Sequence, residues 1–279
     1  MRINVFMSWL MLCLLLCGAN TLAQEDPATE YEPIPGQAGK DVIWLPSTEA
    51  LVEKMLDLAK VTPEDYVIDL GSGDGRIVIS AAKRGARALG IEYNPDLVEF
   101  SRRAAVKAGV ADKAKFEKGD IFETDFSQGT VITMFLLNEV ILKLRPKLFD
   151  MKPGTRLVTN SFTIADWRAD AALRVDEKCV QPVSFCWGFL WIVPAKVDGE
   201  WRLPQGKLTL KQNFQMISGT LKAGNTTMEI REGKLKGKEM TFSLGGAHYA
   251  GHVHGDVMEG DREANGKTEK WTATRVDKN

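Results

Sequence analysis

Val67–Arg76 reads V-I-D-L-G-S-G-D-G-R, and this stretch decides the fold. It opens with an apolar run of the kind that forms a buried parallel strand. Glycines follow at Gly71, Gly73 and Gly75, and a helical pattern then runs over 77–84. A glycine-rich turn between a strand and a helix lets a ligand approach the backbone closely and directs the helix N-terminus at that ligand. We therefore expect a strand, a ligand-binding turn and a helix here.

The spacing of the glycines narrows the class of ligand. A dinucleotide fingerprint, G-x-G-x-x-G, needs glycine at its sixth position, and counting from Gly71 that position is Arg76. Glu92 ends the next apolar run and follows Gly71 by about 20 residues, the spacing at which a carboxylate accepts hydrogen bonds from a ribose diol. The pattern favours a nucleoside-type ligand over a dinucleotide. A surface glutamate at a strand end is the alternative interpretation of Glu92.

The beginning of the chain resembles a signal peptide. Arg2 supplies a positive charge, 5–17 is almost continuously apolar, and small residues at 21–23 favour cleavage before Gln24. We expect export to the periplasm or the medium, with no stable membrane span after cleavage. An uncleaved N-terminal anchor is the alternative. The formal net charge of −1 over 279 residues gives no argument for a nucleic-acid partner.

The rest of the chain divides by texture into three parts. Residues 24–40 are polar and rich in proline and glycine, and predict a flexible arm. Residues 41–197 alternate between strand and helix patterns, which predicts an α/β domain with a Rossmann-like, mostly parallel seven-strand sheet and helices on both faces. Residues 198–279 carry short strand patterns separated by glycine turns, and predict an antiparallel all-β module, either a small barrel or a sandwich.

These patterns place the individual elements. In the α/β part, strands are expected at 67–70, 86–92, 114–118, 130–137 and 156–162, a closing hairpin at 175–181 and 183–197, and helices at 48–60, 77–84, 96–108 and 138–149. In the C-terminal module, strands are expected at 207–212, 215–221, 226–232, 238–244, 248–253 and 270–275.

Several motifs in 42–197 resemble one enzyme family. They read D-L-G-S-G-D-G-R-I-V-I at 69–79, E-Y-N-P-D-L-V at 92–98, L-R-P-K-L at 144–148, M-K-P-G-T-R-L-V at 151–158 and L-W-I-V-P-A at 190–195. The chain resembles class I, S-adenosylmethionine-dependent methyltransferases, and among them bacterial relatives of the mitochondrial protein-lysine methyltransferases that modify adenine nucleotide translocase and the c-subunit of ATP synthase. One position departs from this group, which usually has proline where this chain has Asn138.

The resemblance implies S-adenosyl-L-methionine as cofactor and a lysine side chain of a protein as methyl acceptor. It assigns Asp120 to the adenine amine and Ile121 to the face of the adenine ring, and it places Phe135 near the sulfonium. Trp44 is expected to cover the site from its N-terminal side. The full set of expected cofactor-binding residues is Trp44, Asp69, Gly71, Ser72, Gly73, Gly75, Glu92, Tyr93, Asp120, Ile121 and Phe135.

Asn138 and Glu139 are the expected catalytic residues, because they follow the fourth strand of the sheet. Glu139 either orients or deprotonates a lysine, or favours the dipole of the helix that it begins. Methyltransferases that act on bases or amides use Asn/Asp-Pro-Pro-aromatic here, so Asn138-Glu139-Val140-Ile141 disfavours such acceptors. Two alternatives stay open: an exported, non-catalytic protein that binds a nucleoside-like ligand, and a small-molecule methyltransferase. No motif indicates the acceptor protein or the oligomeric state.

Cysteines and histidines suggest two further sites. Cys179 and Cys186 form a disulfide across the expected hairpin or remain two buried thiols. His248, His252 and His254 differ by even numbers, so in a strand they share one face. Three imidazoles on one face can bind zinc, but a solvent-exposed polar face is the simpler interpretation, and we expect no metal.

Overall fold

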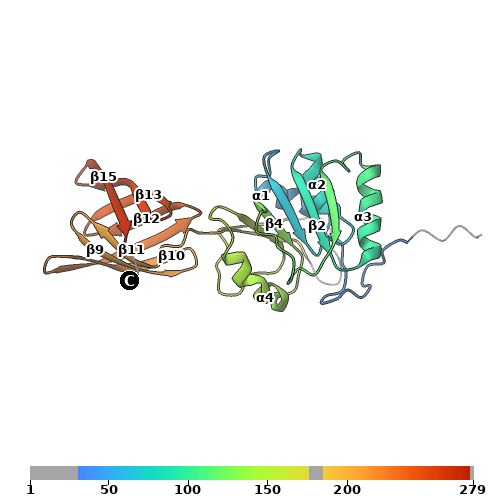
Figure 1. The fold of residues 1–279 in the computed structure, drawn as a ribbon, viewed down its shortest axis with the longest axis horizontal. Coiled ribbons are helices and arrows are strands. Elements are labelled where there is room, and N and C mark those ends of the chain that lie inside the picture. Colours follow the sequence, from blue (N-terminus) through green and yellow to red (C-terminus); the bar gives the residue numbers. More distant parts are fainter. Residues whose placement is uncertain (1–30, 176–184, 277–279) are drawn as a thin grey trace, which may run out of the picture. The chain divides into compact units, whose positions relative to one another are not determined.

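The computed structural model describes residues 31–175 and 185–276. Strands within 66–174 and 187–192 build a seven-stranded sheet with strand order β3-β2-β1-β4-β5-β7-β6 (Figure 1). β7 runs antiparallel to both of its neighbours, and the other pairings are parallel. The strands are β1 Tyr66–Leu70, β2 Arg87–Glu92, β3 Ala114–Lys118, β4 Val131–Met134, β5 Arg156–Asn160, β6 Ala171–Arg174 and β7 Trp187–Ile192. The mostly parallel seven-strand sheet predicted from the sequence is confirmed.

Helices cover both faces of this sheet, as expected. Apolar side chains of α1 (Glu49–Leu58), α2 (Arg76–Lys83) and α3 (Pro95–Lys107) build one buried cluster, whereas those of α4 (Asn138–Phe149) build a second one. The helices begin where the sequence has capping residues. Thr48 Oγ1 accepts a hydrogen bond from the Leu51 amide at 3.3 Å, and Asn94 caps α3 ahead of a proline.

The expected closing hairpin shifts in the structure. The first arm of the closing hairpin was expected at 175–181, but β6 lies at Ala171–Arg174, where only alternate side chains are partly buried. It is an edge strand, so a weak apolar pattern suffices to hold it. Cys186 is disulfide-bonded. Cys179, most of the expected arm and the expected signal peptide lie outside the described residues.

Residues 199–275 form an antiparallel barrel that closes on itself (Figure 1). Its strands are β8 Gly199–Leu203, β9 Gly206–Asn213, β10 Met216–Ala223, β11 Thr226–Lys236, β12 Glu239–Leu244, β13 Ala247–His254, β14 Val257–Ala264 and β15 Lys267–Arg275. Closure comes from β15 pairing with β8 and β9 pairing with β10. Of the two architectures left open by the sequence, the barrel is the one observed.

β8 and β14 were not expected from the sequence. β14 reads V-M-E-G-D-R-E-A, and Met258 is its only fully buried side chain. Gly260 lies opposite Trp271 of β15, and Trp271 also packs against Gly251 of β13. The indole supplies the interior volume that the glycines lack, so the strand needs little apolar sequence of its own.

The barrel joins the sheet through specific contacts. The ring of Phe214 stacks on Trp167 with centroids 5.2 Å apart, and Gln215 Nε2 donates to the Arg168 carbonyl at 2.6 Å. β7 ends at Ile192, which pairs with Arg156 at the start of β5. The chain therefore leaves the sheet for the barrel at the edge opposite the carboxyl ends of the parallel strands. No helix in the described part of the chain is long and apolar enough to cross a membrane.

Candidate active site

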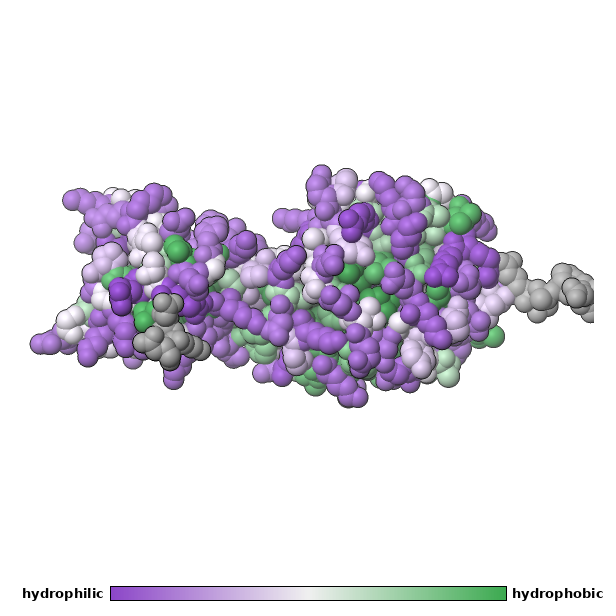
Figure 2. Space-filling model, in the orientation of Figure 1, coloured by the Kyte–Doolittle hydropathy of each residue, from purple (hydrophilic) through white to green (hydrophobic). Residues whose placement is uncertain are grey.

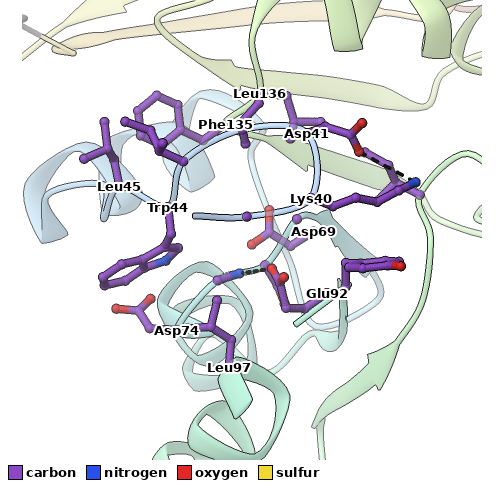
Figure 3. A pocket seen from close by; sticks show the side chains of 18 of the residues that line it. Lys40, Asp41, Trp44, Leu45, Asp69, Asp74, Glu92, Leu97, Phe135 and Leu136 are labelled. Atoms are coloured by element: carbon purple, nitrogen blue, oxygen red, sulfur yellow. Dashed lines mark hydrogen bonds and ion pairs between the residues drawn. The ribbon is translucent and has the colours of Figure 1, made fainter. Parts of the chain in front are cut away.

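A cavity opens at the carboxyl ends of β1, β2 and β4, where the strand order of the sheet reverses (Figure 3). Its empty volume of about 880 Å³ includes open solvent. The walls come from five segments: the end of β1 with the turn after it, the residues at or just after the ends of β2, β3 and β4, and a continuous strap over 39–47.

The glycine turn after β1 has a backbone conformation that residues with a Cβ rarely adopt. Gly71, Gly73 and Gly75 all have positive φ, at 77°, 54° and 80°. A Cβ on Gly73 would collide with the indole of Trp44, so only glycine lets the strap approach this closely. Arg76, the first residue of α2, holds the end of the strap by donating a hydrogen bond to the Ser47 carbonyl.

Two carboxylates converge on the cavity from β1 and β2. Asp69 is buried, and desolvation raises its pKa to about 7. The negative charge of Glu92 raises this pKa further, whereas the Thr133 hydroxyl lowers it by donating a hydrogen bond to Asp69 Oδ1 at 2.7 Å. Glu92 accepts one backbone N–H on each oxygen, from Gly73 and Asn94, both at 2.9 Å. These bonds fix the carboxylate of Glu92 and leave its remaining lone pairs for a ligand (Figure 3).

On another side of the cavity, Lys40 of the strap forms an ion pair with Asp120, two residues after the end of β3. Lys40 Nζ lies 2.5 Å from Asp120 Oδ2, while Asp120 Oδ1 accepts the Phe122 amide at 2.9 Å. The hydrogen bond from Lys40 holds the pKa of Asp120 below its usual range. The ammonium also lies over the rings of Tyr93 and Phe122, 5.2 and 5.5 Å from their centroids.

The structure brings nearly all of the expected cofactor-binding residues to this one cavity. Its lining includes Trp44, Asp69, Gly71, Ser72, Gly73, Glu92, Tyr93, Asp120, Ile121 and Phe135. Gly75 is not in the lining, and a Cβ there would lie 2.6 Å from the Phe116 ring, so its glycine serves packing. Asn138 and Glu139 are exposed on the first turn of α4 and are also absent from the lining. The roles expected for these residues stay predictions.

The sequence did not point to Lys40, which was expected in the flexible arm. The Gly36 amide donates to the Trp44 carbonyl and the Trp44 amide donates to the Gln37 carbonyl, and this closed turn delivers Lys40 to Asp120. Lys40 lies just before the apolar run V-I-W-L, and its partner Asp120 lies 80 residues further along the chain. No local sequence pattern connects the two residues.

The histidines lie on the outer face of the barrel. His248, His252 and His254 are all exposed on β13, and the rings of the last two lie 6.1 Å apart. Within residues 31–175 and 185–276, no group of three or more histidine, cysteine or acidic side chains is arranged to hold a metal ion. Gly251 does not interrupt the pairing of β13 with its neighbours.

Comparison with known proteins agrees with this geometry. Residues 69–171 match the family model described as "ANTKMT methyltransferase domain". A protein-lysine N-methyltransferase of Saccharolobus islandicus is 42% identical over 139 residues, which cover 49% of this chain and 86% of the relative. A rat lysine N-methyltransferase named for the C-subunit of ATP synthase is 36% identical over 128 residues, and the chain spans only 59% of its length.

A solved structure adds a bound ligand. It is described as an RNA methyltransferase from Salinibacter ruber in complex with S-adenosyl-L-homocysteine. It shares 42% identity with this chain at a TM-score of 0.51, covering 55% of this chain and 96% of its own.

The sheet order, the glycine turn and the acidic residues at the carboxyl ends of β1 and β2 define a class I methyltransferase that uses S-adenosyl-L-methionine. Within that class, the chain belongs to the protein-lysine N-methyltransferase family represented by the Saccharolobus relative.

The cavity fits this cofactor chemically. Carboxylates outnumber cations in the lining, with Asp41, Asp69, Asp74, Glu92 and Asp120 against Lys40 and Arg76, which suits a ligand carrying sulfonium and ammonium groups. Glu92 keeps lone pairs for the ribose hydroxyls that the sequence leads us to expect there. The buried Ser72 Oγ has no hydrogen-bond partner among the described residues, so a polar ligand atom can satisfy it.

Proposed function

We propose that this chain transfers methyl groups from S-adenosyl-L-methionine to lysine side chains of a protein. The observation that carries the proposal is the 42% identity to a protein-lysine N-methyltransferase over 86% of that relative. When bound, the cofactor supplies an electrophilic methyl group. The chain's own contribution is positional: Glu92 and the glycine turn hold the cofactor, and the acceptor amine is kept from water so that its neutral form is favoured.

RNA is the second candidate acceptor, because the solved Salinibacter relative is described as an RNA methyltransferase. Charge favours protein over RNA. The chain carries a formal net charge of −1, and the cavity lining has more carboxylates than cations, so phosphates gain little here. The residues after β4, Asn138-Glu139-Val140-Ile141, also lack the Asn/Asp-Pro-Pro-aromatic pattern typical of base methylation.

Incubation of the full chain with methyl-labelled cofactor separates these acceptors. One reaction receives the cell-envelope proteins of a strain that lacks the gene, and a parallel reaction receives its total RNA. We expect labelled methyl-lysine after acid hydrolysis of the protein, none from a Glu92→Ala control, and no label in RNA. Label in RNA alone supports the second candidate. If calorimetry detects no binding of S-adenosyl-L-methionine, the result supports the alternative of a non-catalytic protein that binds another nucleoside-like ligand.

Glu139 is the proposed base or orienting group, and a conservative variant tests it. If Glu139 deprotonates the lysine, Glu139→Gln lowers kcat and moves the acid limb of the pH–rate profile. If it only favours the dipole of α4, the variant loses about 0.3–1 kcal/mol of stability and keeps its pH profile. Asn138→Ala, at the preceding exposed position, serves as the neighbouring comparison.

We also propose that residues 1–23 direct the protein out of the cytoplasm. The support is the sequence pattern alone: Arg2, the apolar run 5–17 and the small residues before Gln24. A fusion of residues 1–40 to alkaline phosphatase is expected to be active, and the mature protein is expected to begin at Gln24. An inactive fusion contradicts export, and an active fusion that keeps Met1 identifies an uncleaved anchor.

A further inference from the structure

Three phenylalanine rings extend one end of the cofactor cavity toward solvent. Phe135 lines the cavity, and its centroid lies 5.1 Å from that of Phe185 and 6.1 Å from that of Phe162. Phe162 and Phe185 are 5.7 Å apart, which completes the triangle. All three side chains are partly exposed. We call these three rings the aromatic wall.

The wall lies away from the part of the cavity expected to hold adenine. In Figure 3, Phe135 and Lys40 lie on opposite sides of the drawn side chains, and Lys40 is the residue paired with Asp120. Ligand atoms that reach the wall are therefore those farthest from Asp120. A second substrate can approach there without competing for the adenine contacts.

The turn that carries Phe162 is held in a costly conformation. Ser161 has φ of 59°, unusual for a residue with a side chain, and its hydroxyl donates to Asn160 Oδ1 at 2.8 Å. Asn160 is fully buried and donates to Ser47 Oγ at 2.8 Å, while the Thr159 hydroxyl donates to the Phe162 carbonyl. These bonds tie the ring's position to the strap over the cavity.

Apolar surface continues outward from the wall. Leu137, two residues after Phe135, is 43% exposed, and Trp187, two residues after Phe185, is 42% exposed. The Trp187 carbonyl accepts the Ser161 amide at 2.8 Å, so this tryptophan adjoins the strained turn. A lysine arriving here packs its aliphatic stem on apolar groups, and its nitrogen meets ring faces that attract cations.

We propose that the aromatic wall of Phe135, Phe162 and Phe185 binds the acceptor lysine side chain and presents its nitrogen to the cavity. This inference rests on the proposed protein-lysine methyltransferase function. The rings favour a cation through their quadrupole and offer no hydrogen-bond acceptor. The wall therefore holds the ammonium of an arriving lysine as well as a trimethylated one, and the arriving lysine loses its proton before the methyl group is transferred.

A binding experiment that needs no turnover tests the wall. Full-length chains with ¹³C-labelled phenylalanine rings are titrated with Nα-acetyl-Nε-trimethyl-lysine methyl ester, and separately with the neutral compound in which carbon replaces the charged nitrogen. We expect the charged compound to shift wall signals at concentrations at least about fivefold lower than the neutral one does. Phe162→Leu keeps apolar volume but removes a ring face, and is expected to abolish that preference.

Phe149→Leu is the matched control. Phe149 belongs to another three-ring cluster, with centroids 5.4 Å from Trp167 and 5.5 Å from Phe214, and it does not line the cavity. This variant is expected to keep the wild-type preference for the charged compound. Equal binding of both compounds to wild type, or the same loss in both variants, overturns the inference.

A transfer assay separates this inference from the function on which it rests. With labelled cofactor and limiting envelope protein, Phe162→Leu is expected to lower the initial rate of lysine methylation at least about tenfold, with cofactor affinity unchanged by calorimetry. If wild type methylates lysine and Phe162→Leu is as fast, only the wall is overturned. If wild type binds the cofactor but labels no lysine, the proposed function fails, and the wall with it.

Discussion

The space beside glycine residues borders a cavity in the α/β unit but is filled by a side chain in the barrel. Next to Gly73 the indole of Trp44 comes close, yet the turn still borders a cavity. Next to Gly251 and Gly260 of the barrel, Trp271 fills the interior. A parallel sheet ends its strands at one edge and leaves backbone groups there for a ligand, whereas a closed barrel pairs its strands all the way round. The site therefore belongs to the sheet, and the barrel offers its outer surface.

The outer surfaces of the α/β unit and the barrel also differ, in how much apolar area they expose. Among the described residues, the large apolar side chains that are well exposed lie outside the barrel, except for Met216. Figure 2 shows apolar residues gathered over part of the α/β unit, while the barrel surface in that view is mainly hydrophilic. Exposed apolar patches mark contact sites. The difference predicts that acceptor contacts concentrate on the α/β unit.

The largest expected effect concerns the barrel core. Phe242 is fully buried and its ring lies 4.6 Å from Tyr249, so Phe242→Ala is expected to lower the free energy of unfolding by about 3–5 kcal/mol. Calorimetric scans with and without S-adenosyl-L-methionine check whether the two regions are separate. We expect the variant to melt its barrel earlier while the cofactor still stabilises the sheet. Loss of cofactor binding in this variant would break the comparison.

Glu92→Ala gives the next largest effect, on cofactor affinity. The carboxylate accepts from the Gly73 and Asn94 amides, so its loss removes ligand hydrogen bonds and loosens the glycine turn. We expect binding to weaken by about 1–3 kcal/mol, measured by titration calorimetry. Glu259→Ala, an exposed glutamate on β14 of the barrel, is the control and is expected to bind normally. Equal loss in both would show that the effect is not local.

The same glycine-to-alanine substitution, made once in each region, compares the cavity with the barrel. Gly73 and Gly224 have φ of 54° and 57°, so alanine costs about 1–2 kcal/mol of strain at either position. A Cβ on Gly224 meets nothing within 4 Å, whereas one on Gly73 displaces Trp44. Thermal melts are expected to show both variants destabilised, with cofactor affinity falling about tenfold or more only in Gly73→Ala. Unchanged affinity there would remove Trp44 from the site.

Much of the sheet and its cavity follows from local pattern. The apolar run before Gly71 and the carboxylate of Glu92 mark a strand, a turn and a ligand contact, and the structure brings them together. Long-range pairing is what the pattern could not show. Lys40 meets Asp120 only because the strap folds back over the cavity, and β14 is held by Trp271 rather than by its own apolar residues.

We expect Asp69 to make cofactor affinity depend on pH. Its pKa is raised from 3.8 to about 7 by burial, so the folded protein keeps a proton between those values that the unfolded chain has lost. Stability therefore falls as pH rises through this window and is flat above it. Affinity for the cationic cofactor moves the other way, strengthening by up to about tenfold per pH unit until about pH 7 as the carboxylate ionises.

Calorimetric titrations from pH 5.5 to 8 check the role of Asp69. Asp69→Asn cannot ionise and is expected to bind more weakly, with a flat pH profile. Asp170→Asn is the matched control, because burial also raises the pKa of Asp170, which lies outside the cavity. The Asp170 variant is expected to keep the wild-type profile, and a profile that survives in Asp69→Asn would assign the pH dependence to another group.

The smallest expected effect tests whether Lys40 competes with the cofactor. Its ammonium pairs with Asp120 and lies over Tyr93 and Phe122, at the position where the adenine amine is expected. Lys40→Met frees Asp120 and keeps the length of the side chain, so affinity for S-adenosyl-L-methionine is expected to rise about two- to five-fold, because an exposed ion pair is weak. Lys270→Met, which breaks an exposed 2.8 Å pair with Asp261 in the barrel, is expected to change nothing. A fall in affinity for Lys40→Met would mean that the lysine contacts the bound cofactor and that the strap belongs to the binding surface instead of blocking it.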